Sequence, residues 1–391
     1  MKITRVRLKN WRNFRDAEVP DFADVTYVLG PNASGKSNFV DALRFLRDIA
    51  KPKGGGLQSA IEDRGGMKKI RCLHARKDTE VLLEVDFLGS ENSVQWTYQL
   101  GFNIPATGHR EPHITQERVT KRTENGKLEE ILNRPDSLDR EDPLRRRETH
   151  LEQIGANSKF REISNYFGTI TYVHLVPQLL KFSDQIGGRI LDDDPFGQEF
   201  LFRIAKTQAR TRDARLRRIE GALQSIVPHL ENLKFINDEV TGYPHLEIKF
   251  KHHRPHGAKQ REDQFSDGTL RLLSILWLLQ ERSDSVLLLE EPELSLNEEI
   301  VSQIPYVIDQ VRKSARSQQQ VIITTHSQAL LSNPGIDPKG LIVIEPTEEG
   351  STIRKTSESE ANALRTGLSP AEVVLPAAQK VSNYTQLILE L

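Results

Sequence analysis

The sequence predicts an α/β fold, and two observations support this class. In the last third of the chain, a fully apolar run at residues 286–289 and a β-branched, largely apolar run at 321–325 alternate with helical patterns such as residues 270–279. Runs that are apolar throughout are typical of parallel strands buried on both faces of a sheet. Near the N-terminus, a third apolar run at residues 25–29 leads through a glycine into a helical pattern. We therefore expect a sheet of parallel strands with helices packed on it.

The remaining elements follow from periodicity and from turn residues. Between residues 110 and 162 there are 12 basic and 12 acidic residues with few large apolar ones, so we expect an exposed insertion with strand-like pieces first and charged helical pieces after. Leu216, Ile219, Leu223 and Ile226 recur at helical spacing before Pro228, which predicts one helix over residues 200–230. The other predicted elements are strands within residues 1–29 and at 79–87, 93–102, 170–176 and 246–250, and a helix that contains residues 39–49.

Composition excludes several classes of protein. The chain has 391 residues, with 54 Lys and Arg against 55 Asp and Glu, so a general polyanion-coating role is not expected. Cys72 is the only cysteine, which excludes an intramolecular disulfide and a cysteine-based zinc cluster. No apolar run reaches the roughly 18–20 residues that a bilayer crossing needs, and the first residues lack a signal-peptide pattern. We expect a cytoplasmic protein without a membrane partner.

A phosphate-binding loop is the strongest motif. Residues 30–37, Gly-Pro-Asn-Ala-Ser-Gly-Lys-Ser, fit the pattern G-x-x-x-x-G-K-[ST] and lie between an apolar strand and a helix, where the chemistry requires them. Glycines let backbone N–H groups surround a phosphate, and the helix start adds a positive dipole end. Lys36 is expected to bridge phosphate oxygens and Ser37 to ligate Mg²⁺. The predicted nucleotide-binding residues here are Gly30, Asn32, Ser34, Gly35, Lys36, Ser37 and Asn38.

Two carboxylates end the apolar strand at residues 286–289. A buried strand delivers them to the carboxyl edge of the sheet, beside the phosphate-binding loop. Glu290 is expected to support Mg²⁺, and Glu291 to act as general base on the attacking water. His326 follows another apolar strand and could bond a γ-phosphate and that water. A lone histidine after a strand is more often structural, so the residues by themselves predict Lys36 and Glu291 as catalytic and leave His326 open.

A fourth motif precedes an apolar helix. Ser266 is a good N-cap residue, and Gly268 allows close backbone approach at a helix N-terminus. Together with Asp267, these residues offer a hydroxyl and N–H groups to a phosphate, although an ordinary helix cap has the same composition. A basic stripe that includes Arg203, Arg210 and Arg217 is either a nucleic-acid contact or a solvated helix face.

These four motifs, in this order, resemble the ABC-type ATPase head of the SMC, RecF and OLD families. The opening residues 2–14 also resemble the start of those heads, and the likeness covers about residues 1–105 and 165–350. The resemblance implies a P-loop NTPase head with a mixed sheet and an inserted charged, largely helical region. We expect a first ATPase lobe at 1–105, the insertion at 106–165, a helical region at 166–235 and a second lobe at 236–391.

The resemblance also implies roles for single residues. Ser266, Asp267 and Gly268 would contact the γ-phosphate of ATP bound to a second subunit, so that two heads enclose two ATP molecules. Gln178 stands where the glutamine of the family's Q-loop, a nucleotide and Mg²⁺ ligand, would lie, with Gln185 as its neighbour. His326 would be the switch histidine.

Three departures from the family pattern stand out. Ala33 replaces a glycine of the commoner loop, Glu290 stands where many relatives carry Asp, and the signature reads Ser-Asp-Gly rather than Ser-Gly-Gly. The segments SDGTLRLL and LLLEEPELSL resemble stand-alone AAA family ATPases, the AAA-21 group of prokaryotic defence islands. Only 65 residues follow His326, so we expect no Toprim nuclease domain.

Three functions remain open at this point. The first is an ATP-hydrolysing switch that dimerises through its ATP and controls a separate effector protein, a nuclease or a toxin, in antiviral defence. The second is a RecF-like DNA repair or recombination ATPase that binds DNA. The third is an ATP-locked scaffold with negligible turnover.

Overall fold

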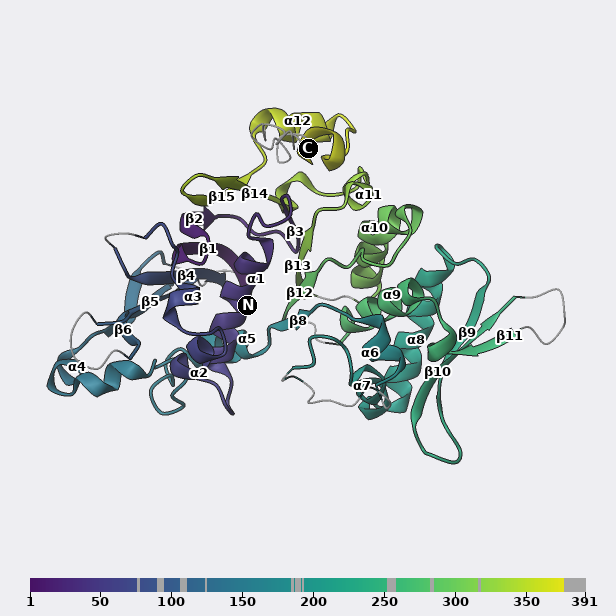
Figure 1. Cartoon of the computed structure of the whole chain (residues 1–391), viewed down its shortest axis with the longest axis horizontal. Coiled ribbons are helices and arrows are strands. Elements are labelled where there is room, and N and C mark those ends of the chain that lie inside the picture. The colour runs from purple at the N-terminus through teal and green to yellow at the C-terminus, as the bar shows by residue number, and fades with distance from the viewer. Residues whose placement is uncertain are drawn as a thin grey trace, which may run out of the picture.

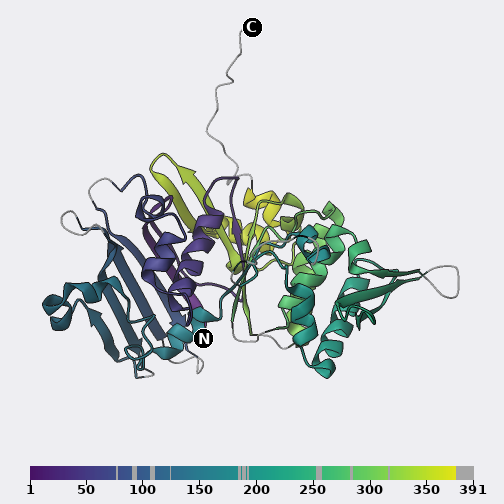
Figure 2. The same ribbon diagram turned by 60° about the horizontal axis from the view of Figure 1, so that its bottom comes forward.

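The computed structural model describes residues 1–75, 78–89, 95–105, 111–123, 125–183, 186, 191, 193–251, 258–281, 285–315 and 318–375. Figure 1 shows a first sheet with helices α1 to α3 on one side of the molecule and helices α6 to α10 on the other. The strands β3, β13, β12 and β8 lie between these two groups, as the turned view of Figure 2 also shows. The motifs predicted to bind nucleotide lie on or next to this central layer.

The central sheet has six strands in the order β15-β14-β3-β13-β12-β8. Five of them run parallel, and only β15 pairs antiparallel. Their bounds are β3 Val25–Leu29, β8 Thr171–Val173, β12 Val286–Glu290, β13 Gln320–Thr325, β14 Leu341–Thr347 and β15 Gly350–Lys355. The predicted α/β class with a mixed sheet is confirmed.

Side chains on the two faces of this sheet enter two separate cores. Leu287, Leu289 and Ile323 pack with the helices of the C-terminal half, whereas Leu288 and Ile322 pack with α1 and the first sheet. Because successive strand residues point to opposite faces, strands buried on both sides must be apolar throughout. This explains the continuous apolar runs of the sequence.

The first sheet is antiparallel, with six strands in the order β2-β1-β4-β5-β6-β7. Its strands are β1 Lys2–Trp11, β2 Phe14–Val19, β4 Val81–Leu88, β5 Gln95–Asn103, β6 His113–Arg122 and β7 Leu128–Arg134. The described part of the stretch 106–165 has strands first and helices after, as its residues predicted, although it is not the largely helical insertion that the resemblance implied. Strands β6 and β7 extend this sheet, Ile114 and Val119 of β6 point into the core, and the helices of the stretch are short.

A buried ionic group holds the charged part of this stretch together. The carboxylate of Glu117, which is fully buried, accepts hydrogen bonds from Tyr98, from Arg134 and from the backbone N–H groups of His150 and Leu151. Arg134 also donates to Asp139 at 2.8 Å. Charges that looked solvated in the sequence therefore include an interior network, which sequence composition alone cannot distinguish from an exposed one.

The helix predicted over residues 200–230 is two helices. Helix α7 (Phe200–Lys206) ends where the hydroxyl of Thr207 donates to the carbonyl of Arg203 at 3.1 Å, and Thr207 and Gln208 take extended ψ angles. Helix α8 (Ala209–Gln224) then begins, and strand β9 follows Pro228. A threonine hydroxyl that bonds a carbonyl one turn back offers the backbone an alternative to continuing the helix.

A three-stranded antiparallel sheet follows α8. Its order is β11-β10-β9, with β9 Leu230–Asn237, β10 Pro244–Phe250 and β11 Ala258–Arg261. The remaining helices are α1 Lys36–Ala50, α2 Leu57–Glu62, α3 Met67–Ile70, α4 Ser137–Glu141, η1 Pro143–Arg147, α5 Arg161–Gly168, α6 Pro177–Lys181, η2 Glu262–Gln264, α9 Asp267–Leu278, α10 Glu298–Ala315, α11 Gln328–Leu331, η3 Pro338–Gly340, α12 Glu358–Arg365 and α13 Pro370–Val373. None of the helices in the described part of the chain combines the length and apolar character that a bilayer crossing requires.

Candidate functional site

The strand order brings the motifs together. β13 lies between β3 and β12, so the carboxyl ends of these three strands form one continuous edge. The loop of residues 30–37 follows β3, Glu290 and Glu291 end β12, and His326 follows β13. Ligand sites of parallel α/β sheets lie at this edge. Glu290 and Glu291, about 250 positions after the loop, and His326, about 290 positions after it, therefore become its neighbours.

The phosphate-binding loop adopts a compact conformation. The ammonium group of Lys36 is buried and donates to the carbonyls of Gly30 at 2.9 Å and Pro31 at 3.0 Å. Burial lowers the pKa of Lys36, and the nearby carboxylates of Glu291, Glu293 and Glu290, at and just after the end of β12, oppose this shift. The hydroxyl of Ser34 is buried and has no hydrogen-bond partner among the described residues. Donors of this kind suit a phosphate ligand.

Asn13 clamps the loop from the β1–β2 turn. Its side-chain amide donates to the carbonyl of Ser34 at 2.8 Å and to Ser351 at 2.7 Å, and it accepts from Asn38 at 2.8 Å. Gly35 has φ +109°, and a Cβ atom there would lie 2.1 Å from the Asn13 amide nitrogen. Gly35 is therefore required twice, by its backbone conformation and by this close approach.

The carboxylate of Glu290 receives two donors from different elements. Ser37, in the first turn of α1, donates to one oxygen, and the phenol of Tyr172 on β8 donates to the other. Serine and carboxylate oxygens are ligands that Mg²⁺ prefers. Among the described residues no group of three or more His, Cys, Asp or Glu side chains is arranged to hold a metal ion.

Glu291 and His326 form a pair beside this carboxylate. The imidazole Nδ1 of His326 lies 3.1 Å from a carboxylate oxygen of Glu291. Glu291 has φ +44°, an unusual conformation for a residue with a side chain, and its N–H donates to Thr324 on β13 at 3.1 Å. Backbone strain of this kind clusters at functional sites. The next carboxylate, Glu293, is buried, which raises its pKa, and accepts from Thr325.

The segment 266–268 caps helix α9. The hydroxyl of Ser266 accepts from the N–H of Thr269 at 3.1 Å, as a helix cap does. Asp267 is held by α6, because Lys181 lies 2.6 Å and the Gln178 amide 3.1 Å from its carboxylate oxygens. Gln178 is thus bonded to the segment 266–268 rather than to Ser37 or Glu290. Gln185 lies outside the described residues.

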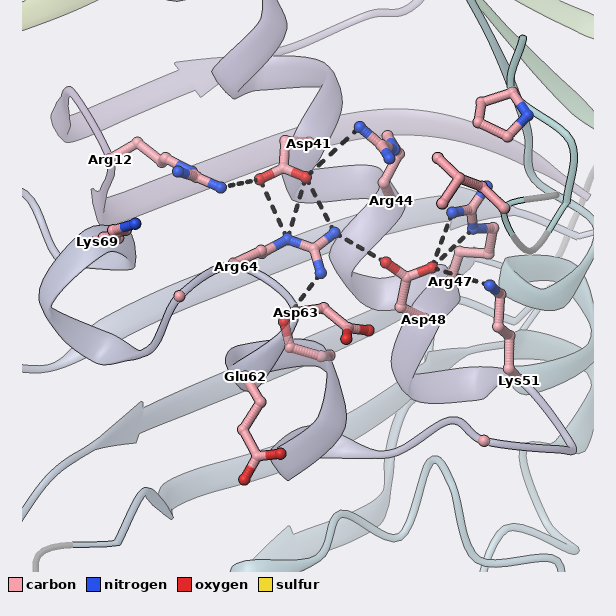
Figure 3. Close-up of a pocket in the computed structure, with 15 residues that line it drawn as sticks. Arg12, Asp41, Arg44, Arg47, Asp48, Lys51, Glu62, Asp63, Arg64 and Lys69 are labelled. Carbon is pink, nitrogen blue, oxygen red and sulfur yellow. Dashed lines mark hydrogen bonds and ion pairs between the residues drawn. The ribbon is translucent and has the colours of Figure 1, made fainter. Parts of the chain in front are cut away.

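A charged cavity of about 870 Å³ lies along the flank of α1 (Figure 3). Asp41 pairs with Arg12 at 2.7 Å and with Arg64 at 3.0 Å. Arg64 also reaches Asp48 at 2.9 Å. These ion pairs tie α1 to the turn after α2 and to the β1–β2 turn, which stabilises the helix that carries Lys36 and Ser37.

Sequence reasoning missed three residues of this site. Tyr172 stood within an apolar run and carried no motif, and Lys181 pairs with Asp267 across 86 positions of sequence. Asn13 was noted only as part of the opening segment. An asparagine in a turn beside a glycine-rich loop could have been proposed as a clamp, but nothing in one sequence identifies its partners.

Solved structures share this fold. The crystal structure of the SmcHead bound to the C-winged helix domain of ScpA matches with a TM-score of 0.56 at 14% identity, covering 92% of this chain and 100% of that chain. An Smc head domain with an extended coiled coil, derived with its ScpA partner from Pyrococcus furiosus, matches with a TM-score of 0.51 at 12% identity, covering 93% and 98%. The chain therefore has the fold of an Smc head domain, with a P-loop motif at the carboxyl edge of its central sheet.

The family follows from residues 25–332, which match the family described as "AAA domain, putative AbiEii toxin, Type IV TA system". Because the match covers most of the chain, the chain belongs to this family. Residues 3–46 also match the "P-loop containing region of AAA domain". Membership of this ATPase family implies nucleotide binding, as the phosphate-binding loop predicted.

Curated relatives match over short stretches only. The DNA replication and repair protein RecF of Chlamydia caviae is 50% identical over 46 residues, 12% of this chain and 12% of that protein. RecF of Lactococcus lactis subsp. cremoris is 31% identical over 85 residues, 22% of this chain and 24% of that protein. The Structural maintenance of chromosomes protein 1 of Arabidopsis thaliana is 30% identical over 88 residues, 20% of this chain and 7% of that protein.

Proposed function

We propose that this chain binds and hydrolyses ATP at the loop 30–37 with Mg²⁺. The observation that carries the proposal is the convergence of Ser37 with Glu290, and of Glu291 with His326, at the sheet edge next to Lys36. Lys36 exchanges its loop carbonyls for phosphate oxygens, while the backbone of Gly30, Asn32, Ser34 and Gly35 surrounds the phosphates. Bound by Ser37 and Glu290, Mg²⁺ supplies charge neutralisation on the phosphates.

Glu291 is proposed as the general base. Its carboxylate is partly exposed at the sheet edge, where a water can reach it, and its contact with His326 orients both side chains. His326 is proposed to bond the γ-phosphate and so to report whether that phosphate is present. Loss of the γ-phosphate then changes the contacts of His326 and Glu291 together.

We further propose that two copies enclose two ATP molecules, with Ser266, Asp267 and Gly268 contacting the γ-phosphate on the other subunit. A carboxylate would repel a phosphate, and the ion pair of Asp267 with Lys181 supports the proposal because it compensates that charge. The shared fold of the SMC heads also supports it. ATP then joins two subunits, and hydrolysis releases them.

The biological role that we favour is control of a separate effector, a nuclease or a toxin, in prokaryotic antiviral defence. The description of the matched family names a toxin and a Type IV TA system, and this supports a role in a toxin-based system. A scaffold with negligible turnover remains an alternative, and it differs in predicting that Glu291→Gln changes nothing in the rate of hydrolysis.

A RecF-like role in DNA repair is the second candidate. Four basic side chains of α7 and α8 are exposed, although one of them, Arg218, donates to Gln280 at 3.3 Å. Two of the others pack on aromatic rings: Arg215 lies over Trp277, and Arg212 over Phe235. The exposed residues are Lys206, Arg210, Arg217 and Arg218. A salt-dependent affinity for duplex DNA that falls when Arg210 and Arg217 become Glu would favour this role.

The test compares the wild type with Lys36→Ala and Glu291→Gln, using equilibrium binding of labelled ATP and release of phosphate. We expect Lys36→Ala to lose ATP binding, and Glu291→Gln to retain it while hydrolysis falls about 100-fold or more. Unchanged ATP binding by Lys36→Ala would refute the binding site. Equal hydrolysis by the wild type and Glu291→Gln would refute the role of Glu291.

A further inference from the structure

Tyr172 is the second donor to the carboxylate of Glu290, and the sheet places it there. β8 pairs with β12 in parallel, with Tyr172 opposite Leu288. Glu290 lies two residues beyond Leu288 and therefore on the same face of the sheet. The phenol of Tyr172 extends along this face toward the strand end and donates to Glu290. The contact thus follows from strand register, and no surface loop contributes to it.

The ring of Tyr172 is itself held in place. The guanidinium of Arg44 lies over it, 3.8 Å from the ring centroid, in cation–π geometry. Arg44 is seven residues after Ser37 on α1, so both side chains leave the same face of the helix. Figure 3 shows Arg44 next to Asp41 at the charged cavity. One face of α1 therefore carries a donor to Glu290 and the residue that packs against the other donor.

The length of the Glu290 side chain explains why its carboxylate needs a second hydrogen-bond donor. Compared with an aspartate, Glu290 has one more rotatable bond, so its carboxylate needs an additional restraint to stay at one position. Tyr172 occupies one oxygen, which leaves the other directed at Ser37.

We propose that Tyr172 is a positioning residue that fixes the carboxylate of Glu290 for Mg²⁺, with Arg44 holding the tyrosine ring. The inference rests on the proposed Mg²⁺-dependent ATP binding. It gives a role to Tyr172 on β8 and to Arg44 on α1, although neither residue belongs to a sequence motif.

The experiment measures ATP binding as a function of Mg²⁺ concentration for Tyr172→Phe, Glu290→Asp and the double variant. Because a hydrogen bond to a charged group is lost, Tyr172→Phe should raise the half-saturating Mg²⁺ concentration about tenfold and leave Mg²⁺-free ATP binding unchanged. Aspartate is too short to reach the phenol, so adding Tyr172→Phe to Glu290→Asp should cause no further shift. Tyr98→Phe is the matched control, since Tyr98 donates to the buried carboxylate of Glu117 at 3.1 Å.

Two results would overturn the inference while Mg²⁺-dependent binding by the wild type is intact. One is a Tyr172→Phe curve that coincides with those of the wild type and Tyr98→Phe. The other is an equal shift from Tyr172→Phe with Glu290 or Asp at position 290, which would show that the phenol acts on something other than this carboxylate. A wild type without any Mg²⁺ effect on ATP binding would instead refute the proposed function.

Discussion

Replacement of Gly35 by Ala tests how the phosphate-binding loop is built. The backbone there has φ +109°, and the new Cβ atom would lie 2.1 Å from the amide nitrogen of Asn13. Asn13 must then move and give up its hydrogen bonds to Ser34, Ser351 and Asn38. Because the displaced amide leaves its hydrogen-bond partners unsatisfied, the variant should have a lower free energy of unfolding and bind ATP poorly.

The expected loss of unfolding free energy in Gly35→Ala has two parts. Alanine at a positive φ costs about 1 kcal/mol from backbone strain alone. Three displaced hydrogen bonds add about 1 kcal/mol each, or about 3 kcal/mol in all. Gly367→Ala is the matched control, because Gly367 has φ +100° with no atom within 4 Å of the added Cβ. It should show the strain without the displacement.

The assay is urea denaturation of the two single variants, of Asn13→Ala and of the double variant Asn13→Ala/Gly35→Ala, with ATP binding measured in parallel. In the Asn13→Ala background, Gly35→Ala should cost no more than Gly367→Ala does in the wild type, because the obstructing amide is gone. If Gly35→Ala and Gly367→Ala destabilise the protein equally, the account of Asn13 as a clamp is wrong.

Two further predictions concern charges. Lys181→Met removes the positive charge that compensates Asp267, so ATP-dependent dimerisation should weaken about tenfold while ATP binding by the single subunit stays the same. Adding Asp267→Asn should restore dimerisation, and sedimentation with ATP measures the dimerisation of both variants. Dimerisation unaffected by Lys181→Met would contradict the role of this pair. Burial raises the pKa of Glu152 from its ordinary 4.5 to about 7. Because the pKa of Glu152 is higher in the folded than in the unfolded protein, protonated Glu152 contributes to the free energy of unfolding. This contribution is fully present below about pH 4.5 and is lost as the pH rises through 7, by up to about 3 kcal/mol. Glu152→Gln should flatten the fall in unfolding free energy between pH 5 and 8, and parallel pH profiles of the variant and the wild type would show that another group causes the fall.

Much of the fold was predictable because its signals are local. The loop 30–37, the apolar strands and the paired glutamates each lie within a few consecutive residues, and strand burial on two faces imposes apolar runs. The break between α7 and α8 was not predictable from hydrophobic periodicity, since Leu216 and Ile219 keep their spacing while the hydroxyl of Thr207 ends the preceding helix.

The partners of the site residues were less predictable. Tyr172 meets Glu290 across 118 positions of sequence, and only the pairing of β8 with β12 brings them together. The charges of residues 110–162 posed the same difficulty. Glu117 and Arg134 have the composition of a solvated face, yet they form a buried ion pair at 3.0 Å. Contacts of this kind depend on topology, which local pattern does not contain.

The central claim is that ATP joins two subunits through the segment 266–268. The direct test is the solution mass of Glu291→Gln with ATP and Mg²⁺, with and without Ser266→Asp. Aspartate also caps helices, so α9 is preserved, but its charge would face the γ-phosphate on the other subunit. We expect twice the monomer mass for Glu291→Gln and the monomer mass for the double variant, with ATP still bound to both. A double variant that remains dimeric, or a Glu291→Gln protein that is monomeric with ATP bound, would contradict it.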